Sequence, residues 1–246
     1  MDYEIVILLG MLLLAATLYS AAGQGGGSGY LAVMALFGLT PMVMKPAALA
    51  MNVAVTLLTL GITRGIRHIP VKLCMAVTVP SFPTALLGGY FLPPAAVYGY
   101  LVAGALVVAA LSLWRERREL PLVTPPRPIT LAPIGGLLGL ISGLTGVGGG
   151  IFLAPILLIK RWADLRATLA MSSAFILINS IAALIGHAFS NYEWPSEMPM
   201  MIAAALLGAL LGSVWGRRYL GTAGVRWLLG GVLLVAAARM VFFAHQ

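Results

Sequence analysis

Charged side chains are scarce in this chain, because Asp, Glu, Lys and Arg together make up only 9% of its 246 residues. Soluble domains carry about 25% charged residues. In contrast, 61% of this sequence is hydrophobic and its mean hydropathy is +1.00. We therefore predict an integral membrane protein, with no room for a separate soluble domain once the apolar segments are placed.

Acidic residues and cysteine are also rare. All seven Asp and Glu residues fall at the ends of apolar runs or between them, and Cys74 is the single cysteine. An intramolecular disulfide and a cysteine metal cluster are therefore excluded. Intramembrane metal and aspartyl proteases need His, Glu or paired Asp residues within the spans, and a serine protease would have only His187 as a partner. We predict that the protein is not an enzyme, with no catalytic residue, metal site or cofactor.

The basic residues are in excess, with a formal net charge of +8. A nucleic-acid-binding protein would gather such charge on one basic face. Here the Lys and Arg residues form small clusters between apolar runs, as the positive-inside rule of membrane proteins expects. The predicted partner is therefore the lipid bilayer and not nucleic acid.

Two short glycine strings interrupt the apolar sequence: Gly23-Gln24-Gly25-Gly26-Gly27 and Gly146-Val147-Gly148-Gly149-Gly150. Each glycine weakens a helix by about 1 kcal/mol relative to alanine, so we expect the helix to break at both strings. The apolar stretches that follow, 28–39 and 151–159, are too short to cross a bilayer comfortably. Broken backbone at membrane depth is tolerated only where it is buried in protein or lines a cavity. A pair of such breaks in two halves of a chain indicates the binding site of a transporter.

Apolar runs of about 17 to 25 residues, long enough to cross a bilayer, complete each half. In the first half they lie near 46–63, 71–92 and 95–114, after the broken pair 5–22 and 28–39. In the second half they lie near 167–188, 198–216 and 224–243, after the broken pair 131–145 and 150–160. We predict an all-α integral membrane protein of two inverted repeats, each a glycine-broken helix pair plus three transmembrane helices. The predicted divisions are 1–118, a basic, proline-rich cytoplasmic linker over 119–129, and 130–246.

Short local matches between the halves also favour an internal repeat. Ala48-Leu49-Ala50-Met51-Asn52 resembles Thr168-Leu169-Ala170-Met171-Ser172, and Leu86-Leu87-Gly88-Gly89 resembles Leu210-Leu211-Gly212-Ser213. Gly104 and Gly231 have similar surroundings. With the glycine strings, these make four matches in the same order.

The positions of Lys and Arg predict the orientation. The loop at 64–72 and the linker are basic and are expected in the cytoplasm, whereas the loop at 190–197 holds two acids without Lys or Arg and is expected outside. Both termini are then predicted outside, and the two broken pairs open to opposite sides. Lys45 is the clear exception to the rule.

A helix that begins at membrane depth presents unpaired N–H groups and about +0.5 charge. If each broken pair is a re-entrant hairpin, two such N-termini face each other and form a site for a small oxyanion. A full span followed by a short oblique helix remains the other geometry. The alternative function of the glycines is close helix packing alone. The predicted substrate-binding residues are Gly23, Gln24, Gly25, Gly26, Gly27, Ser28, Asn52, Thr145, Gly146, Gly148, Gly149, Gly150, Ser172 and Ser173.

The two Gly-x-Gly-Gly-Gly strings, Pro155 and the basic loop at 160–166 before Thr168-Leu169-Ala170-Met171-Ser172 resemble the sulfite exporter TauE/SafE family over nearly the whole chain. The resemblance implies a multi-pass carrier of the bacterial inner membrane. It also implies an exported substrate of one class, sulfite or another small sulfur oxyanion or organosulfonate. The sequence leaves the oligomeric state open, a homodimer included.

Alternating access around the central site is the expected mechanism. No acid within the spans offers a proton-coupling group, and His187 is the single histidine near one. An anion that leaves an inside-negative cell gains about 2.3 kcal/mol per charge per 100 mV, so the membrane potential is sufficient to drive export. A passive anion channel is the alternative, and a scaffold for another membrane complex is a further hypothesis that absence of anion binding would favour.

Overall fold

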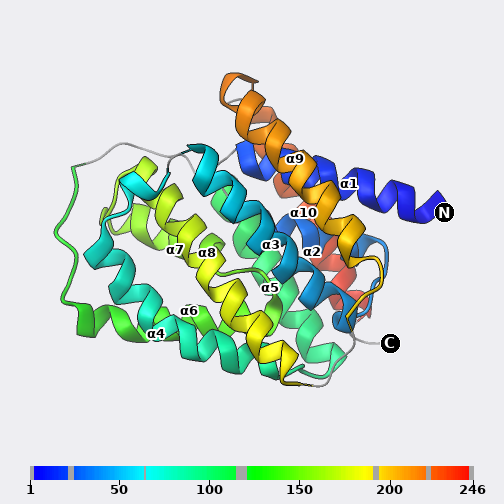
Figure 1. The fold of residues 1–246 in the computed structure, drawn as a ribbon, viewed down its shortest axis with the longest axis horizontal. Helices are drawn as coiled ribbons and strands as arrows, with labels where there is room; N and C mark the ends of the chain where they lie inside the picture. Colours follow the sequence, from blue (N-terminus) through cyan, green and yellow to red (C-terminus); the bar gives the residue numbers. More distant parts are fainter. Residues whose placement is uncertain are drawn as a thin grey trace.

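The computed structural model describes residues 3–21, 25–63, 65–114, 121–190, 194–219 and 223–243, and every regular element within these residues is a helix. Figure 1 shows the helices packed around a centre that includes α2, α3, α7 and α8. The elements are α1 (Tyr3–Ala21), α2 (Gly27–Leu36), α3 (Pro41–Thr63), the 3-10 helix η1 (Gly65–His68), α4 (Val71–Tyr90), α5 (Ala95–Trp114), α6 (Pro128–Thr145), α7 (Gly150–Ile159), α8 (Leu165–Ala188), α9 (Met198–Tyr219) and α10 (Ala223–Phe243).

The outside of the helical bundle is apolar. Within the described residues, six helices are long and apolar enough to cross a membrane, namely α1, α3, α4, α5, α6 and α8. Leu57, Leu111 and Val214 are 55%, 56% and 63% exposed. Apolar exposure of this extent marks a surface that is covered by another apolar phase, and here that phase is the lipid bilayer. The prediction of a multi-pass helical membrane protein is confirmed.

The helical path breaks at both glycine strings, as predicted. α1 ends at Ala21 and α2 begins at Gly27, while α6 ends at Thr145 and α7 begins at Gly150. α2 and α7 contain 10 residues each, so each is about 15 Å long, half of a hydrocarbon core of about 30 Å. All residues of α2 up to Ala35 are buried. These short helices therefore begin inside protein, where broken backbone is tolerated.

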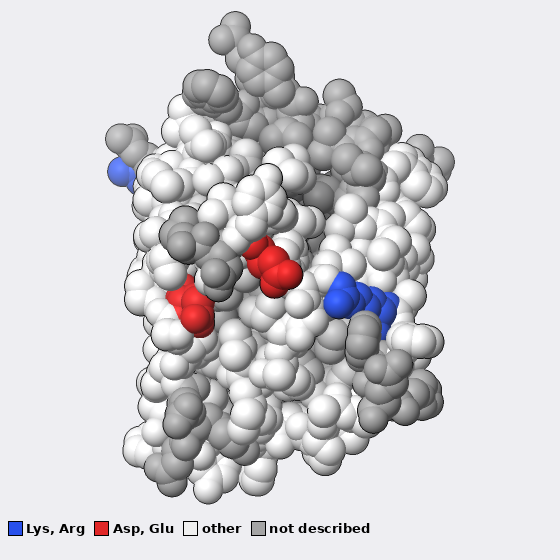
Figure 2. Space-filling view, turned by 90° about the vertical axis from the view of Figure 1, so that its right-hand side faces the viewer, with Lys and Arg blue, Asp and Glu red and all other residues white. Residues whose placement is uncertain are grey.

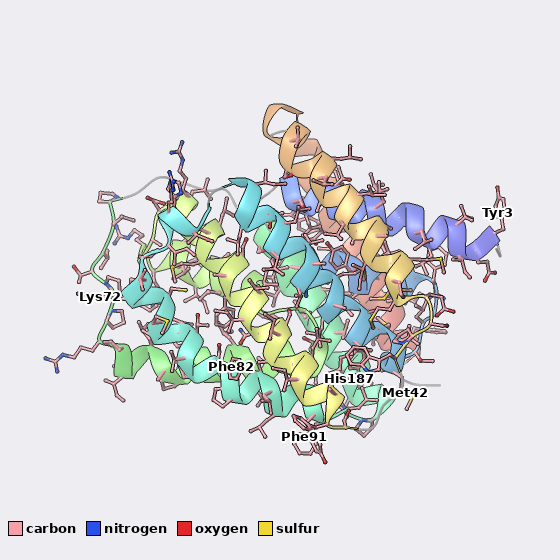
Figure 3. The ribbon with its side chains drawn as sticks, viewed as in Figure 1. Tyr3, Met42, Lys72, Phe82, Phe91 and His187 are labelled. Carbon is pink, nitrogen blue, oxygen red and sulfur yellow. The ribbon has the colours of Figure 1, made fainter. Side chains whose placement is uncertain are left out.

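The two broken pairs begin and end at opposite ends of the molecule. Tyr3 opens the first pair and Met42 follows it, and both lie at the right-hand end of Figure 3. The segment before α6 and the segment after α7 are joined, because the Val123 N–H donates to the Arg161 carbonyl oxygen at 2.7 Å. The green segment before α6 runs along the left-hand side of Figure 1, and Figure 3 labels Lys72 at the same end.

Close packing of backbones supports two helix pairs, α4 with α6 and α9 with α1. A Cβ built on Gly88 of α4 would lie 2.7 Å from the Leu140 carbonyl oxygen of α6. A Cβ built on Gly212 of α9 would lie 2.1 Å from the Thr17 carbonyl oxygen of α1. Gly88 and Gly212 are matched in the sequence comparison of the halves. The separation of Thr17 and Leu140 in the sequence equals that of Gly27 and Gly150, the first residues of α2 and α7. The two contacted carbonyls therefore come from equivalent positions of the two halves.

Two helices begin at least three residues earlier than the sequence predicts. α3 begins at Pro41 rather than at 46, so Lys45 and Pro46 lie inside it. The predicted apolar run near 46–63 leaves Lys45 out, but the structure includes this lysine in the helix, with its Nζ donating to the Gly88 carbonyl oxygen. α6 begins at Pro128 rather than at 131, because proline is well tolerated at the first position of a helix.

Candidate functional site at the glycine strings

The two glycine strings meet in the interior of the protein. Gly25, Gly26 and Gly27 of the first string and every residue of the second are buried. A Cβ built on Gly27 would lie only 2.3 Å from the Val147 carbonyl oxygen. The backbones of the two strings are therefore in van der Waals contact, an approach that only glycine permits at this position.

The residues that precede α2 and α7 have the same uncommon backbone conformation. The N-cap of α2 is Gly26 with φ 89°, and the N-cap of α7 is Gly149 with φ 78°. Both lie in the left-handed region, which is strained for other L-residues. No side chain caps either helix. Because the first N–H groups of a helix have no partner within it, both N-termini direct backbone donors and partial positive charge into the buried interior.

Asn52 of α3 and Ile176 of α8 pack between the strings. The Asn52 Nδ2 donates to the Gly146 carbonyl oxygen at 3.2 Å and lies 2.7 Å from the Cβ position of Gly27. Side-chain atoms of Ile176 come within 3.2, 2.7 and 2.6 Å of the Cβ positions of Gly25, Gly148 and Gly150. One polar and one apolar side chain thus contact both strings.

Several buried polar atoms around the strings have no hydrogen-bond partner among the described residues: Asn52 Oδ1, Tyr30 OH, Ser142 Oγ and Ser172 Oγ. The Tyr30 hydroxyl lies 2.6 Å from the Cβ position of Gly26, and the Ser142 Cβ lies 3.1 Å from that of Gly149. Leaving such a group unsatisfied costs about 1–3 kcal/mol. Clusters of these groups in native proteins indicate a bound ion, water or ligand.

Other predicted site residues hold the local structure. Ser28 donates to the Tyr19 hydroxyl at 3.0 Å. Thr145 donates to the Ile141 carbonyl oxygen at 2.7 Å and accepts from the Val147 N–H at 3.3 Å. Ser173 is buried in α8 at 6% exposure.

Gly23 and Gln24 lie outside the described residues. The structure therefore brings together, from the predicted set, the glycines from Gly25 to Gly27, the four glycines of the second string, and Asn52. The backbone of Ser172 lies next to Gly150, because the Ser172 carbonyl oxygen is 2.9 Å from the Cβ position of that glycine.

Lys45 is the residue beside this site that the sequence interpretation missed. It is 0% exposed, and its Nζ donates to the carbonyl oxygens of Gly88, Gly89 and Phe91 at 2.8, 2.9 and 2.6 Å. These carbonyls belong to the C-terminal end of α4, the negative end of its dipole. The Lys45 carbonyl oxygen lies 3.1 Å from the Cβ position of Gly146. The sequence feature that could have identified Lys45 is a single lysine at the start of an apolar run.

His187 lies away from the strings, in the last turn of α8. It is 1% exposed, and its ring packs edge-on against Trp194 with 5.1 Å between centroids. Figure 3 places it at the same end of the molecule as Met42 and Phe91.

The groups at the strings are suited to binding rather than to acid–base or metal chemistry. Within the described residues, no three His, Cys, Asp or Glu side chains gather into a possible metal site. The donors on hand are backbone N–H groups, serine and tyrosine hydroxyls, and one amide. Such groups hold an anion by hydrogen bonding at a helix N-terminus.

Comparisons with known proteins agree on one family. A family model described as "Sulfite exporter TauE/SafE" matches residues 8–240. The chain is 34% identical over 247 residues to "Probable membrane transporter protein y4hK" of Sinorhizobium fredii (strain NBRC 101917 / NGR234), which covers 98% of this chain and 100% of that protein.

Two proteins of Xylella fastidiosa named "Probable membrane transporter protein" are also similar. The protein of strain Temecula1 / ATCC 700964 is 31% identical over 107 residues, 41% of each chain. The protein of strain 9a5c is 31% identical over 118 residues, 46% of this chain and 45% of that protein. No solved structure matches the chain significantly.

Proposed function

Because this chain belongs to the sulfite exporter TauE/SafE family, a family of transporters rather than enzymes, we propose that it exports a small sulfur-containing anion. The proposed site lies where the N-termini of α2 and α7 meet. The observation that carries the proposal is the pair of buried, uncapped N-termini, each preceded by a glycine of positive φ. Sulfite or an organosulfonate is the proposed substrate. Sulfite is named in the description of the family, and an organosulfonate is what the resemblance found in the sequence implies.

The unpaired polar atoms are the second support for a ligand. Ser142 Oγ and Ser172 Oγ are buried around the strings without partners among the described residues. Serine hydroxyls can donate to an anion, as can the backbone N–H groups. An anion held in this way needs no arginine within the membrane, where insertion of a charge costs about 2.5–3.5 kcal/mol.

The proposed mechanism is alternating access between two inverted repeats, residues 1–118 and 130–246, joined by the linker 119–129. Helix contacts occur in the pairs that a two-fold relation between the halves would produce: α4 with α6 and α9 with α1, and α4 with α8 and α9 with α3. The strings are in contact through Gly27 and Val147, so an anion between them needs the halves to move apart. Rocking of one repeat against the other provides that movement.

We also propose that the end with the exposed basic residues faces the cytoplasm, so that both termini lie outside. Exposed Lys and Arg come from η1, the start of α4, the segments before α6 and after α7, and the start of α8: Arg67, Lys72, Arg127, Lys160, Arg161 and Arg166. Figure 2 views the opposite end, where acidic residues lie near the centre of the view and basic atoms appear right of centre and at the upper left edge, among uncharged atoms. Excess Lys and Arg on one side is the signature of the cytoplasmic face. A bacterial inner membrane is the proposed location.

Transport by purified protein in liposomes tests the proposal. We expect saturable efflux of labelled sulfite that unlabelled sulfite, sulfate or methanesulfonate inhibits. A passive channel would instead give unitary currents in a planar bilayer without saturation at millimolar anion. Absence of both binding and flux for these anions would contradict the proposed function.

A further inference from the structure

Lys45 is a buried positive charge whose acceptors are all uncharged. Its Nζ donates to the three carbonyl oxygens of Gly88, Gly89 and Phe91, so every proton of the ammonium group has a partner. Within the described residues, no carboxylate pairs with it. Buried charges in proteins are paired with opposite charge or coordinated, because an uncompensated charge is strongly destabilising. The end of the α4 dipole and the carbonyls offset part of this cost but supply no full negative charge.

The Lys45 charge lies close to the second glycine string. The Lys45 Cα is 3.3 Å from the Cβ position of Gly146. A lysine side chain reaches about 6 Å from Cα to Nζ, so the ammonium is within roughly 11 Å of that glycine. Asn52, which donates to the same Gly146, follows Lys45 by seven residues and therefore lies two turns along the same face of α3. One face of α3 thus carries both the amide that touches the strings and the charge behind them.

We propose that Lys45 determines the charge selectivity of the site, and that the transported anion supplies the counter-charge that the described residues do not provide. This inference rests on the proposed function. Lys45 does not contact the anion; it stabilises the bound anion through space, across the Gly146 backbone. For an anion beside Gly146, about 11 Å from Nζ, an effective dielectric constant of about 20 gives an attraction that amounts to roughly tenfold in affinity per negative charge. A dianion gains roughly the square of that factor.

Two anions of similar shape and different charge test the proposal: methanesulfonate, with one charge, and sulfate, with two. Equilibrium binding of each is measured on the purified full-length protein and on Lys45→Gln, Lys45→Met and Lys45→Arg. Lys72→Gln is the matched control, because it removes the same charge from an exposed position at the other end of the molecule. Thermal unfolding in detergent is recorded for every variant.

We expect the neutral variants at Lys45 to lose about tenfold in methanesulfonate affinity and about a hundredfold in sulfate affinity. Lys45→Arg and Lys72→Gln are expected to keep both affinities within about threefold of wild type, because neither removes the charge behind the strings. The dependence on anion charge is the decisive readout, since a lysine that only holds α4 in place would change both affinities by the same factor.

Three changes in the variants would overturn the inference, as would unchanged affinity of the neutral variants for both anions. The first is an equal loss of affinity for the two anions in the neutral variants, and the second is an equal loss in Lys45→Arg and Lys45→Gln. The third is failure of both Lys45→Gln and Lys45→Met to fold, which would make Lys45 a structural residue. If the wild-type protein binds neither anion, the proposed function itself fails. If it binds both and the neutral variants bind them equally well, only the role of Lys45 is lost.

Discussion

Gly27→Ala addresses the contact between the two glycine strings directly. The new Cβ would lie 2.3 Å from the Val147 carbonyl oxygen and 2.7 Å from the Asn52 Nδ2. Ordinary contact needs about 3.4 Å, so the strings must separate by about 1 Å. This separation displaces the hydrogen-bond donors of the proposed site, because they come from the backbone of both strings.

Overpacking of this kind costs about 1–3 kcal/mol, of which the higher helix propensity of alanine returns at most about 1 kcal/mol. We therefore expect a net loss of about 1–2 kcal/mol in stability. Transport is expected to fall at least tenfold, because displacing positioned groups by about 1 Å costs far more in function than in stability.

The assay is initial-rate sulfite efflux from proteoliposomes, with thermal unfolding in detergent measured on the same preparations. Gly104→Ala of α5 is the matched control, because nothing lies within 4 Å of its Cβ position, and we expect unchanged transport with equal or higher stability. Wild-type efflux and unfolding temperature in Gly27→Ala would refute the conclusion that the strings must touch.

Three further predictions follow from the same geometry. Asn52→Leu removes the donor to the Gly146 carbonyl oxygen, so we expect about 1 kcal/mol lower stability and at least tenfold weaker sulfite binding in a direct binding assay; unchanged affinity would exclude Asn52 from the site. Gly26→Ala and Gly149→Ala each force a side chain into the left-handed region, at about 1–2 kcal/mol, and similar falls in unfolding temperature are expected from both; a fall in only one would count against equivalent N-caps. An outside-positive potassium diffusion potential should accelerate anion efflux from liposomes, whereas efflux that follows only a pH gradient would favour proton coupling.

Glycine and proline made the course of the helices predictable. α5 spans the predicted 95–114, α4 begins at the predicted 71, and both breaks fall at the glycine strings. The reason is physical: a run of glycines removes helix propensity locally, and an apolar run of fixed length has few ways to sit in a bilayer. The relation between the two halves remains a proposal, supported by the paired contacts of Gly88 and Gly212.

The hydrogen-bond partners of buried polar side chains were much less predictable from the sequence. Ser28 and Asn52 are both polar residues in apolar segments, yet Ser28 bonds to Tyr19 while Asn52 reaches the opposite string. Only the register of packed helices decides between these outcomes. In the sequence, Lys45 stands out only as an exception to the positive-inside rule. Nothing local in the sequence shows that the three carbonyls that accept its protons come from the end of a different helix.

The most direct test of the central claim is an experimental structure of the protein with selenite, an analogue of sulfite whose heavy atom can be located by anomalous scattering. We predict selenium density between the N-termini of α2 and α7, within hydrogen-bonding reach of the backbone N–H groups at Gly27 and Gly150. Selenium bound elsewhere, with the two strings free of it at saturating selenite, would contradict the account.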